Sequence, residues 1–133
     1  MKVLLDTHVW LWWLTPDSPL ARAERLGLDA CAGNREVLLS PISLWEAQML
    51  HAKGRLELPG PFADWLTKAA DESVLTLAPL DADVVLALDA MPKSFHGDPA
   101  DRLIVATARA HRLKLATHDA AIRRSRLVSL WNS

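Results

Sequence analysis

Residues 96–110 read His-Gly-Asp-Pro-Ala-Asp-Arg-Leu-Ile-Val-Ala-Thr-Ala-Arg-Ala, and this pattern predicts the start of a helix. Asp98 is suited to the N-cap, the proline after it to the first helical position, and residues of high helix propensity follow. Asp101 is unusual, because Ile104 and Val105 share its face of the helix. A carboxylate on a face that turns toward the core needs a metal ion, a basic partner or a proton. A second interpretation stays open, in which both aspartates serve only the positive end of the helix.

The length and composition indicate one globular domain, residues 1–133. Half of the residues are apolar and 23% are charged, which is enough for a single core and too apolar for a disordered chain. Cys31 is the only cysteine, so an internal disulfide is impossible and a reducing compartment is expected. The first apolar run stops at Asp6 and is too short for a signal peptide, and no apolar stretch is long enough to cross a membrane. We therefore expect a cytoplasmic protein without membrane contact.

The near-neutral net charge of −1 conceals an uneven distribution along the chain. Residues 1–100 hold 8 Lys and Arg against 14 Asp and Glu, a balance of −6. Residues 101–133 hold 7 Lys and Arg against 2 aspartates, a balance of +5. A basic end beside acidic residues is compatible with a polyanionic partner, although a solvated helical face explains the same pattern.

Short apolar runs alternate with helical patterns along the whole chain. Strands are expected at residues 2–5, 36–39, 74–77, 113–117 and 127–130. Helices are expected near residues 8–14, 18–32, 42–53, 61–71, 82–90, 99–110 and 120–124. This alternation predicts an α/β fold, a three-layer α/β/α sandwich with a short, mainly parallel central sheet.

The segment after the first strand contains three of the six tryptophans, Trp10, Trp12 and Trp13. In a helix, Trp10 and Trp13 share a face while Trp12 points elsewhere. Core packing explains the shared face, and a partner surface is the alternative for the remaining ring.

Four acids occupy positions where a site is expected. Asp6 and Asp119 come at the carboxyl ends of predicted strands, where open α/β sheets bind ligands. Glu46 lies on an apolar helix face, as Asp101 does. Together they predict carboxylates that converge at one end of the sheet. Clustered carboxylates hold protons unless a cation joins them, and oxygen ligands suit Mg²⁺ or Mn²⁺.

Such a centre predicts hydrolysis of phosphodiester bonds by a metal-activated water, without a separate histidine base. Other chemistries have weaker support. The chain has no Gly-rich phosphate loop and no Gly-x-Ser-x-Gly elbow, and its five histidines lack the spacing of zinc ligands.

The chain resembles the PIN-domain ribonucleases, and among them the VapC-like toxins of bacterial type II toxin–antitoxin systems. The matching motifs stand in family order and span nearly the whole chain. They are Leu-Leu-Asp6-Thr-His, Ser43-Leu-Trp-Glu46, the stretch from His96 through Asp98-Pro-Ala-Asp101 to Ala108, and Leu115-Ala-Thr117-His118-Asp119. Two positions depart from the family pattern. Ala100 stands where a bulky aromatic is expected, and His118 where many relatives carry Asn or a small polar residue.

The resemblance implies a PIN-like fold and a Mg²⁺-dependent endoribonuclease, with Mn²⁺ as a substitute. Its catalytic acids and metal ligands correspond to Asp6, Glu46, Asp101 and Asp119, with Asp98 as a further ligand. Whether Asp98 or Asp101 contacts the metal directly stays open, with Asp101 favoured. Thr7, Thr117, His118 and Arg102 are the expected substrate-binding residues.

The resemblance also implies partners: an RNA substrate, a cognate antitoxin protein that covers the site, and a second copy of the chain in a homodimer. The tryptophan-rich segment and the helices before Gly54 are the expected contact surfaces. Two other functions stay open, a non-catalytic interaction module on the same fold and a metal-dependent phosphohydrolase of another substrate.

Overall fold

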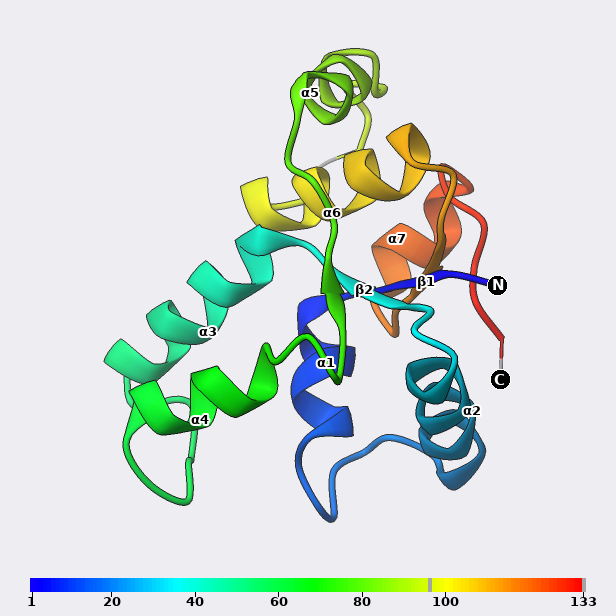
Figure 1. Ribbon diagram of the computed structural model, residues 1–133. Coiled ribbons are helices and arrows are strands. Elements are labelled where there is room, and N and C mark those ends of the chain that lie inside the picture. The colour runs from blue at the N-terminus through cyan, green and yellow to red at the C-terminus, as the bar shows by residue number, and fades with distance from the viewer. Residues whose placement is uncertain (96, 133) are drawn as a thin grey trace.

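The sheet has four short strands in the order β3-β2-β1-β4, and every neighbouring pair is parallel (Figure 1). The computed structural model describes residues 1–95 and 97–132 of the chain. The strands are β1 (Val3–Leu5), β2 (Val37–Leu39), β3 (Thr76–Leu77) and β4 (Lys114–Ala116). Leu4 of β1 lies opposite Leu38 on one side and Leu115 on the other. Because all the strands run the same way, their carboxyl ends share one edge of the sheet.

Helices cover both faces of this sheet. They are α1 (Thr7–Trp13), α2 (Arg22–Gly33), α3 (Pro41–Ala52), α4 (Phe62–Ala69), α5 (Ala82–Asp89), α6 (Pro99–Ala110) and α7 (Ala120–Ser125). Successive strand side chains point to opposite faces. Val3 and Leu5 therefore join a core cluster with α1 and α2, and Leu4 joins another with α6 and α7. Figure 1 shows these helix pairs on opposite sides of β1. The predicted three-layer sandwich with a parallel sheet is confirmed.

Three helices begin with a capping side chain next to the helix starts that the sequence predicts. The side chains of Ser40, Asp81 and Asp98 accept hydrogen bonds from backbone N–H groups of the following turn, at 3.2, 3.1 and 2.8 Å. Each bond satisfies a donor that the helix leaves without a partner. Gly54 follows α3 with a φ of +69°, which glycine adopts without strain. The structure gives no description of His96, which the first motif includes, or of Ser133.

Two predicted strands are shorter than expected. Residues 127–130 form only one parallel bridge, between Leu115 and Leu130, so the predicted last strand is wrong. Residues 74–77 contribute only Thr76–Leu77, because the N–H groups of Val74 and Leu75 donate to the Asp71 carbonyl and form a turn instead.

One predicted helix start is also wrong. The helix expected at residues 18–32 begins only at Arg22. The Ser18 hydroxyl is not a helix cap here. It donates to the Trp12 carbonyl at 2.7 Å and accepts from Arg25 at 3.0 Å, which ties the loop after α1 to α2.

The tryptophans after β1 belong mainly to the core. Trp10 is fully buried and Trp13 is 9% exposed, and the Trp13 indole donates to Asp29 of α2 at 2.8 Å. Trp12 is half-buried and packs edge-on against the His8 ring. The exposed tryptophan is Trp45 on α3, with 52% of its surface accessible. Core packing therefore accounts for Trp10 and Trp13, and Trp45 is the ring available to a partner.

None of the helices in the described ranges is both long enough and apolar enough to span a bilayer.

Two leucines on α2 provide a matched test of this packing. Leu28 is fully buried between α2 and the sheet, whereas Leu26 is 56% exposed. We expect Leu28→Ala to lower the free energy of unfolding by about 2–5 kcal/mol, because it removes buried contacts and leaves a cavity. Leu26→Ala makes the same change in helix propensity and should cost less than about 1 kcal/mol. Urea denaturation measures both, and equal losses would contradict the assigned orientation of α2.

Candidate active site

The carboxyl edge of the sheet carries the candidate site. Asp6 directly follows β1, and Thr117 and Asp119 follow β4, the neighbouring parallel strand. The Asp6 N–H donates to the Ala116 carbonyl at 2.9 Å, so the ends of the two strands are joined by a hydrogen bond. Adjacent parallel strands thus bring together residues that are more than a hundred positions apart in the chain.

Both carboxylate oxygens of Asp6 are held by short hydrogen bonds, and its side chain is only 2% exposed. Oδ1 accepts from the Thr7 N–H at 2.9 Å, and Oδ2 accepts from the Thr117 hydroxyl at 2.7 Å. The Thr117 hydroxyl in turn accepts from the Asp119 N–H at 3.0 Å. His8 Nδ1 lies 3.5 Å from Oδ2. This buried carboxylate therefore has one fixed orientation, set by Thr7 and Thr117.

Glu46 reaches the same place from α3. The Thr7 hydroxyl donates to Glu46 Oε1 and is within 2.7 Å of the Ser43 hydroxyl, one helical turn before Glu46. Burial raises the pKa of Glu46, and the nearby Asp98 and Asp6 carboxylates raise it further, against the opposing effect of the Thr7 hydrogen bond. Thr7 thus connects the carboxylate on α3 to the one that follows β1.

Asp101 is the most perturbed of the acids. Burial first, and then the negative charges of Asp6, Asp98, Asp119 and Glu46, together raise its pKa from 3.8 to about 7. An interaction with all four other acids means that they share one electrostatic environment. The predicted convergence of the carboxylates is therefore present in the described structure.

A small cavity lies at the centre of this group. Its volume is about 140 Å³, and it is lined by the carboxylates of Asp6, Glu46 and Asp101 together with Thr7, His8, Leu11 and Leu50. Asp98 and Asp119 stand outside this lining, and one oxygen of each caps a helix, α6 and α7 respectively. Within the described ranges, no ion pair joins Lys or Arg to any of the five acids. The charges of the cavity thus lack a Lys or Arg counterpart, and His8 is the basic side chain in its lining.

This donor set fits a hard, hydrated cation in its chemistry, because carboxylate and hydroxyl oxygens are the ligands that Mg²⁺ prefers. The arrangement is not a closed ligand cage. In the part of the chain that the structure describes, no three His, Cys, Asp or Glu side chains surround one point closely enough to hold an ion. Mg²⁺ usually keeps several waters and binds one or two carboxylates directly, so a cage of three is not required.

His118 points away from the acids. Its ring nitrogen Nε2 lies 2.7 Å from Glu24 of α2, and its ring packs against Trp12. Its backbone N–H donates to His8 Nε2 at 2.9 Å. Burial lowers the pKa of His8, and the Asp6 carboxylate opposes that shift. His118 therefore lies at the rim of the site and is engaged by α2.

Arg102 anchors the segment that leads into α6. Its guanidinium donates to the Phe95 carbonyl at 2.6 Å. A Cβ at Gly97 would come within 3.0 Å of the Phe95 ring and 3.1 Å of the Asp101 Cβ, so a side chain here would force one of these neighbours to shift slightly. Ala100, where the family resemblance predicts a bulky aromatic residue, is small and buried. The aromatic ring that packs beside Gly97 is that of Phe95. The Arg102 hydrogen bond and the close packing at Gly97 thus hold Phe95 next to the start of α6, which carries Asp101.

Sequence reasoning gave no role to Ser43, His8 or Glu24. Ser43 stands three residues before Glu46 and so shares its helix face, which was a usable signal. His8 stands two residues after Asp6, but its contact with that carboxylate depends on the turn into α1. Glu24 had no local signal, since its partner His118 lies 94 residues away.

Comparisons with known proteins agree with this fold. The PIN domain family matches residues 3–126. Ribonuclease VapC22 of Mycobacterium tuberculosis is 36% identical over 132 residues, 97% of this chain and 98% of that protein. The crystal structure of VapBC2 from Rickettsia felis, bound to a promoter DNA fragment, superposes with a TM-score of 0.74 at 19% identity and covers 99% of this chain and 98% of its own. FitAcB from Neisseria gonorrhoeae superposes with a TM-score of 0.67 at 25% identity, over 98% and 97% of the two chains.

Protonation of Asp101 should link pH to the stability of the metal-free protein. A pKa of about 7 in the folded chain, against an ordinary 3.8, means that the folded state binds more protons than the unfolded state between these values. The free energy of unfolding should therefore fall as pH rises through this window, and the raised pKa of Glu46 acts in the same direction. Urea denaturation in a chelator at a series of pH values measures the fall. Asp101→Asn should reduce it and the exposed Asp64→Asn on α4 should not, and an unchanged fall in Asp101→Asn would contradict the assignment.

Proposed function

The chain belongs to the PIN domain family, and from this premise we propose that it is a Mg²⁺-dependent endoribonuclease, the toxin component of a toxin–antitoxin pair. The observation that carries the proposal is the cavity at the carboxyl edge of the sheet, which Asp6, Glu46 and Asp101 line without a Lys or Arg among its other residues. A relative 36% identical over nearly its full length has the name of a ribonuclease, which supports RNA as the substrate.

Asp6 and Asp101 are the proposed direct ligands of the metal. Asp101 takes precedence over Asp98 because its carboxylate lines the cavity, whereas an Asp98 oxygen accepts from the Asp101 N–H at 2.8 Å. Glu46 completes the lining, and Asp98 and Asp119 add negative charge from the rim. A bound Mg²⁺, or Mn²⁺ in its place, supplies a water of lowered pKa and stabilises charge at the phosphorus centre.

The neighbouring polar residues position these carboxylates. Thr117 and the Thr7 N–H hold the two oxygens of Asp6, and the Thr7 hydroxyl holds Glu46, so the ligands are oriented before an ion arrives. A preorganised site loses less entropy on binding than one whose side chains rotate freely. In this proposal the two threonines act on substrate through the carboxylates that they orient.

Arg102 and His118 are the proposed phosphate contacts. Arg102 donates one N–H to Phe95, and a guanidinium has five N–H donors in all, so it can also serve a phosphate. His118 is 40% exposed at the rim and would exchange its contact with Glu24 for one with RNA.

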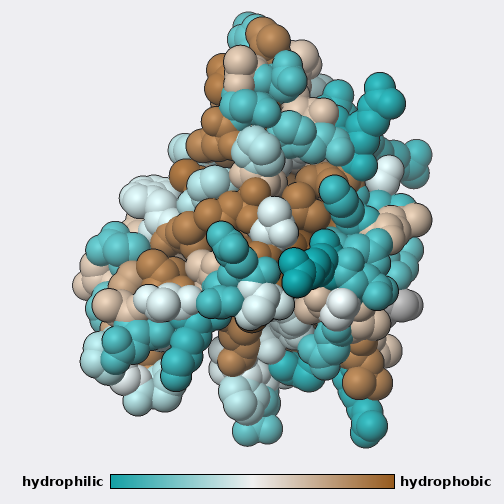
Figure 2. Space-filling model, viewed as in Figure 1, coloured by the Kyte–Doolittle hydropathy of each residue, from teal (hydrophilic) through white to brown (hydrophobic). Residues whose placement is uncertain are grey.

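An antitoxin protein and a second copy of the chain are the proposed partners. A solved structure with this fold is that of VapBC2, which supports a protein partner. The proposed antitoxin surface is the exposed apolar part of α2 and α3, Leu26 and Trp45, which lies within the helices before Gly54. Over α5, Figure 2 shows hydrophobic side chains among polar ones, and Val85 and Leu86 are 55% and 66% exposed, a surface suited to the homodimer contact. The single free Cys31 is compatible with the cytoplasmic location that we propose.

Neutralising the central carboxylates should abolish cleavage. Asp6→Asn and Asp101→Asn preserve the shape of the side chain but remove its charge, so we expect at least a roughly hundredfold loss of Mg²⁺-dependent cleavage of total RNA. A panel of structured RNA, DNA and small phosphate esters identifies the substrate class. The control Asp64→Asn should cleave as the wild type does. Undiminished cleavage by either site variant would overturn the role of that residue.

Metal binding has a separate readout in thermal stability. Addition of Mn²⁺ to chelator-treated protein should raise the Tm, because an ion that binds only the folded state stabilises it and relieves the repulsion between the carboxylates. The rise in Tm should be smaller for Asp101→Asn than for Asp64→Asn. The baseline in each case is the Tm of the same chelator-treated variant in Ca²⁺-free buffer without Mn²⁺. A non-catalytic interaction module would show neither the rise nor cleavage, and that outcome would contradict the proposed function.

A further inference from the structure

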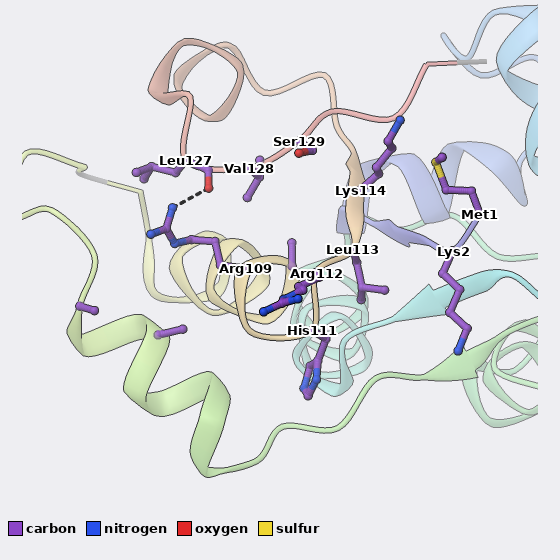
Figure 3. Close-up of a pocket in the computed structure, with 13 residues that line it drawn as sticks. Met1, Lys2, Arg109, His111, Arg112, Leu113, Lys114, Leu127, Val128 and Ser129 are labelled. Carbon is purple, nitrogen blue, oxygen red and sulfur yellow. Dashed lines mark hydrogen bonds between the residues drawn. The ribbon is translucent and has the colours of Figure 1, made fainter.

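A second and larger cavity lies at the amino edge of the sheet, opposite the acids (Figure 3). Its volume is about 820 Å³. The lining includes Lys2, just before β1, and Lys114, the first residue of β4, so the cavity lies where these two parallel strands begin. The last turn of α6 contributes Arg109, the turn after it contributes Arg112, and the segment after α7 closes one side. The floor between these cations consists of small and apolar side chains, among them Ala87, Ala108, Leu113 and Val128.

The cations of this cavity are largely uncompensated. No Asp or Glu is among the lining residues. The two acids that pair nearby engage other groups: Glu36 pairs with the Met1 amine, and Asp81 lies 3.5 Å from His111. Within the described residues, no ion pair involves Lys2, Arg112 or Lys114. This basic cavity therefore has an excess of positive charge. The cavity lined by Asp6, Glu46 and Asp101 at the carboxyl edge, called the acidic cleft below, has an excess of negative charge.

The positions of the cations favour a chain of phosphates over a single one. Figure 3 shows Lys2 and Lys114 extending to opposite sides of the cavity, with Arg112 and Arg109 along the end of α6. Arg109 also donates to the Leu127 carbonyl at 2.6 Å, which fixes this side of the cavity. Cations that are separated along a surface can each contact a different phosphate of a nucleic-acid backbone.

Helix α7 connects the two edges of the sheet. It begins at its N-cap Asp119, beside the acids, and the chain that leaves it reaches Leu127 at the basic cavity. Its six residues span about 9 Å. It carries the exposed Arg123 and Arg124, and Arg123 donates to the Thr117 carbonyl at 3.0 Å. A path of positive charge therefore leads from the rim of the acidic cleft to the basic cavity.

We propose that the basic cavity is an RNA-binding exosite. An RNA strand that enters the acidic cleft continues along α7, and its phosphates distant from the cleavage point contact Lys2, Arg112 and Lys114. This inference rests on the proposed ribonuclease function. The physical need for it is clear, since the lining of the acidic cleft repels RNA and phosphate contacts with Lys and Arg supply most of the affinity for nucleic acid.

The test measures RNA binding in a chelator, where cleavage cannot occur. The exosite variant combines Lys2→Gln, Lys114→Gln and Arg112→Asn, with Asn because position 112 has a φ of +54°, which Asn tolerates. The control variant combines Arg22→Gln, Lys53→Gln and Lys68→Gln, which removes the same charge from exposed positions on α2, at the end of α3 and on α4. Equal Tm values for the two variants and the wild type establish that all three proteins are folded.

We expect the exosite variant to bind an RNA of about 20 nucleotides at least tenfold more weakly than the control variant at low salt. The slope of log Kd against log salt should fall by about 2, since each lost single-strand phosphate contact removes about 0.7. A dinucleotide, which at about 3.4 Å per nucleotide is shorter than the roughly 9 Å of α7, should be cleaved equally by both variants in Mg²⁺.

Equal binding of the long RNA by the two variants would overturn the exosite, as would a wild type that does not bind RNA at all. If the exosite variant lost affinity only for inorganic polyphosphate or mononucleotides and not for the long RNA, the exosite would also be overturned, because the cavity would then be a pocket for small ligands. Failure of the proposed function has a different signature, which is absence of cleavage by the wild type in Mg²⁺ while the difference in binding persists.

Discussion

The fold holds several like-charged carboxylates close together at one edge of the sheet, against their mutual repulsion. Asp6, Glu46 and Asp101 line a cavity of about 140 Å³ without a neutralising Lys or Arg in its lining. The cost appears in Asp101, whose pKa is raised to about 7 by burial and then by the neighbouring negative charges. A fold selected for stability alone would place a basic residue or an apolar one here, because buried like charges destabilise the folded state. Such a cluster is therefore better explained by a cation that it serves than by packing.

The rest of the fold holds these charges in place. Hydrogen bonds from Thr7 and Thr117 fix Asp6, and the Thr7 hydroxyl joins α3 to β1 through Glu46 and Ser43. The strands beneath are short, but β1 is buried on both faces by two separate core clusters. Burial of both faces provides the stability against which the repulsion acts. Four cations line the cavity at the opposite edge and two more are exposed on α7, so the two edges of the sheet carry groups of opposite charge.

Much of the fold was predictable from local pattern. Ser40, Asp81 and Asp98 were recognisable as caps because a cap interacts with the next turn of its own helix. The apolar runs of β1, β2 and β4 were recognisable for a similar reason. The failures have a common cause. Whether residues 127–130 pair along their whole length with β4, and whether Ser18 caps a helix or joins the loop to Arg25, depends on partners distant in the sequence.

Local sequence patterns established that acids follow two strands and lie on two core-facing helix surfaces, and that residues 101–133 carry a net charge of +5. The tertiary arrangement was needed to show which acids line the cavity and which stand at its rim. It was also needed to show that Glu24 contacts His118 and that four Lys and Arg side chains line a cavity at the edge opposite the acids. The reason is physical. A residue type and its helical or strand period are local properties of the chain, but a pKa near 7 or an unpaired cation results from neighbours that only the parallel sheet and its crossover helices bring together.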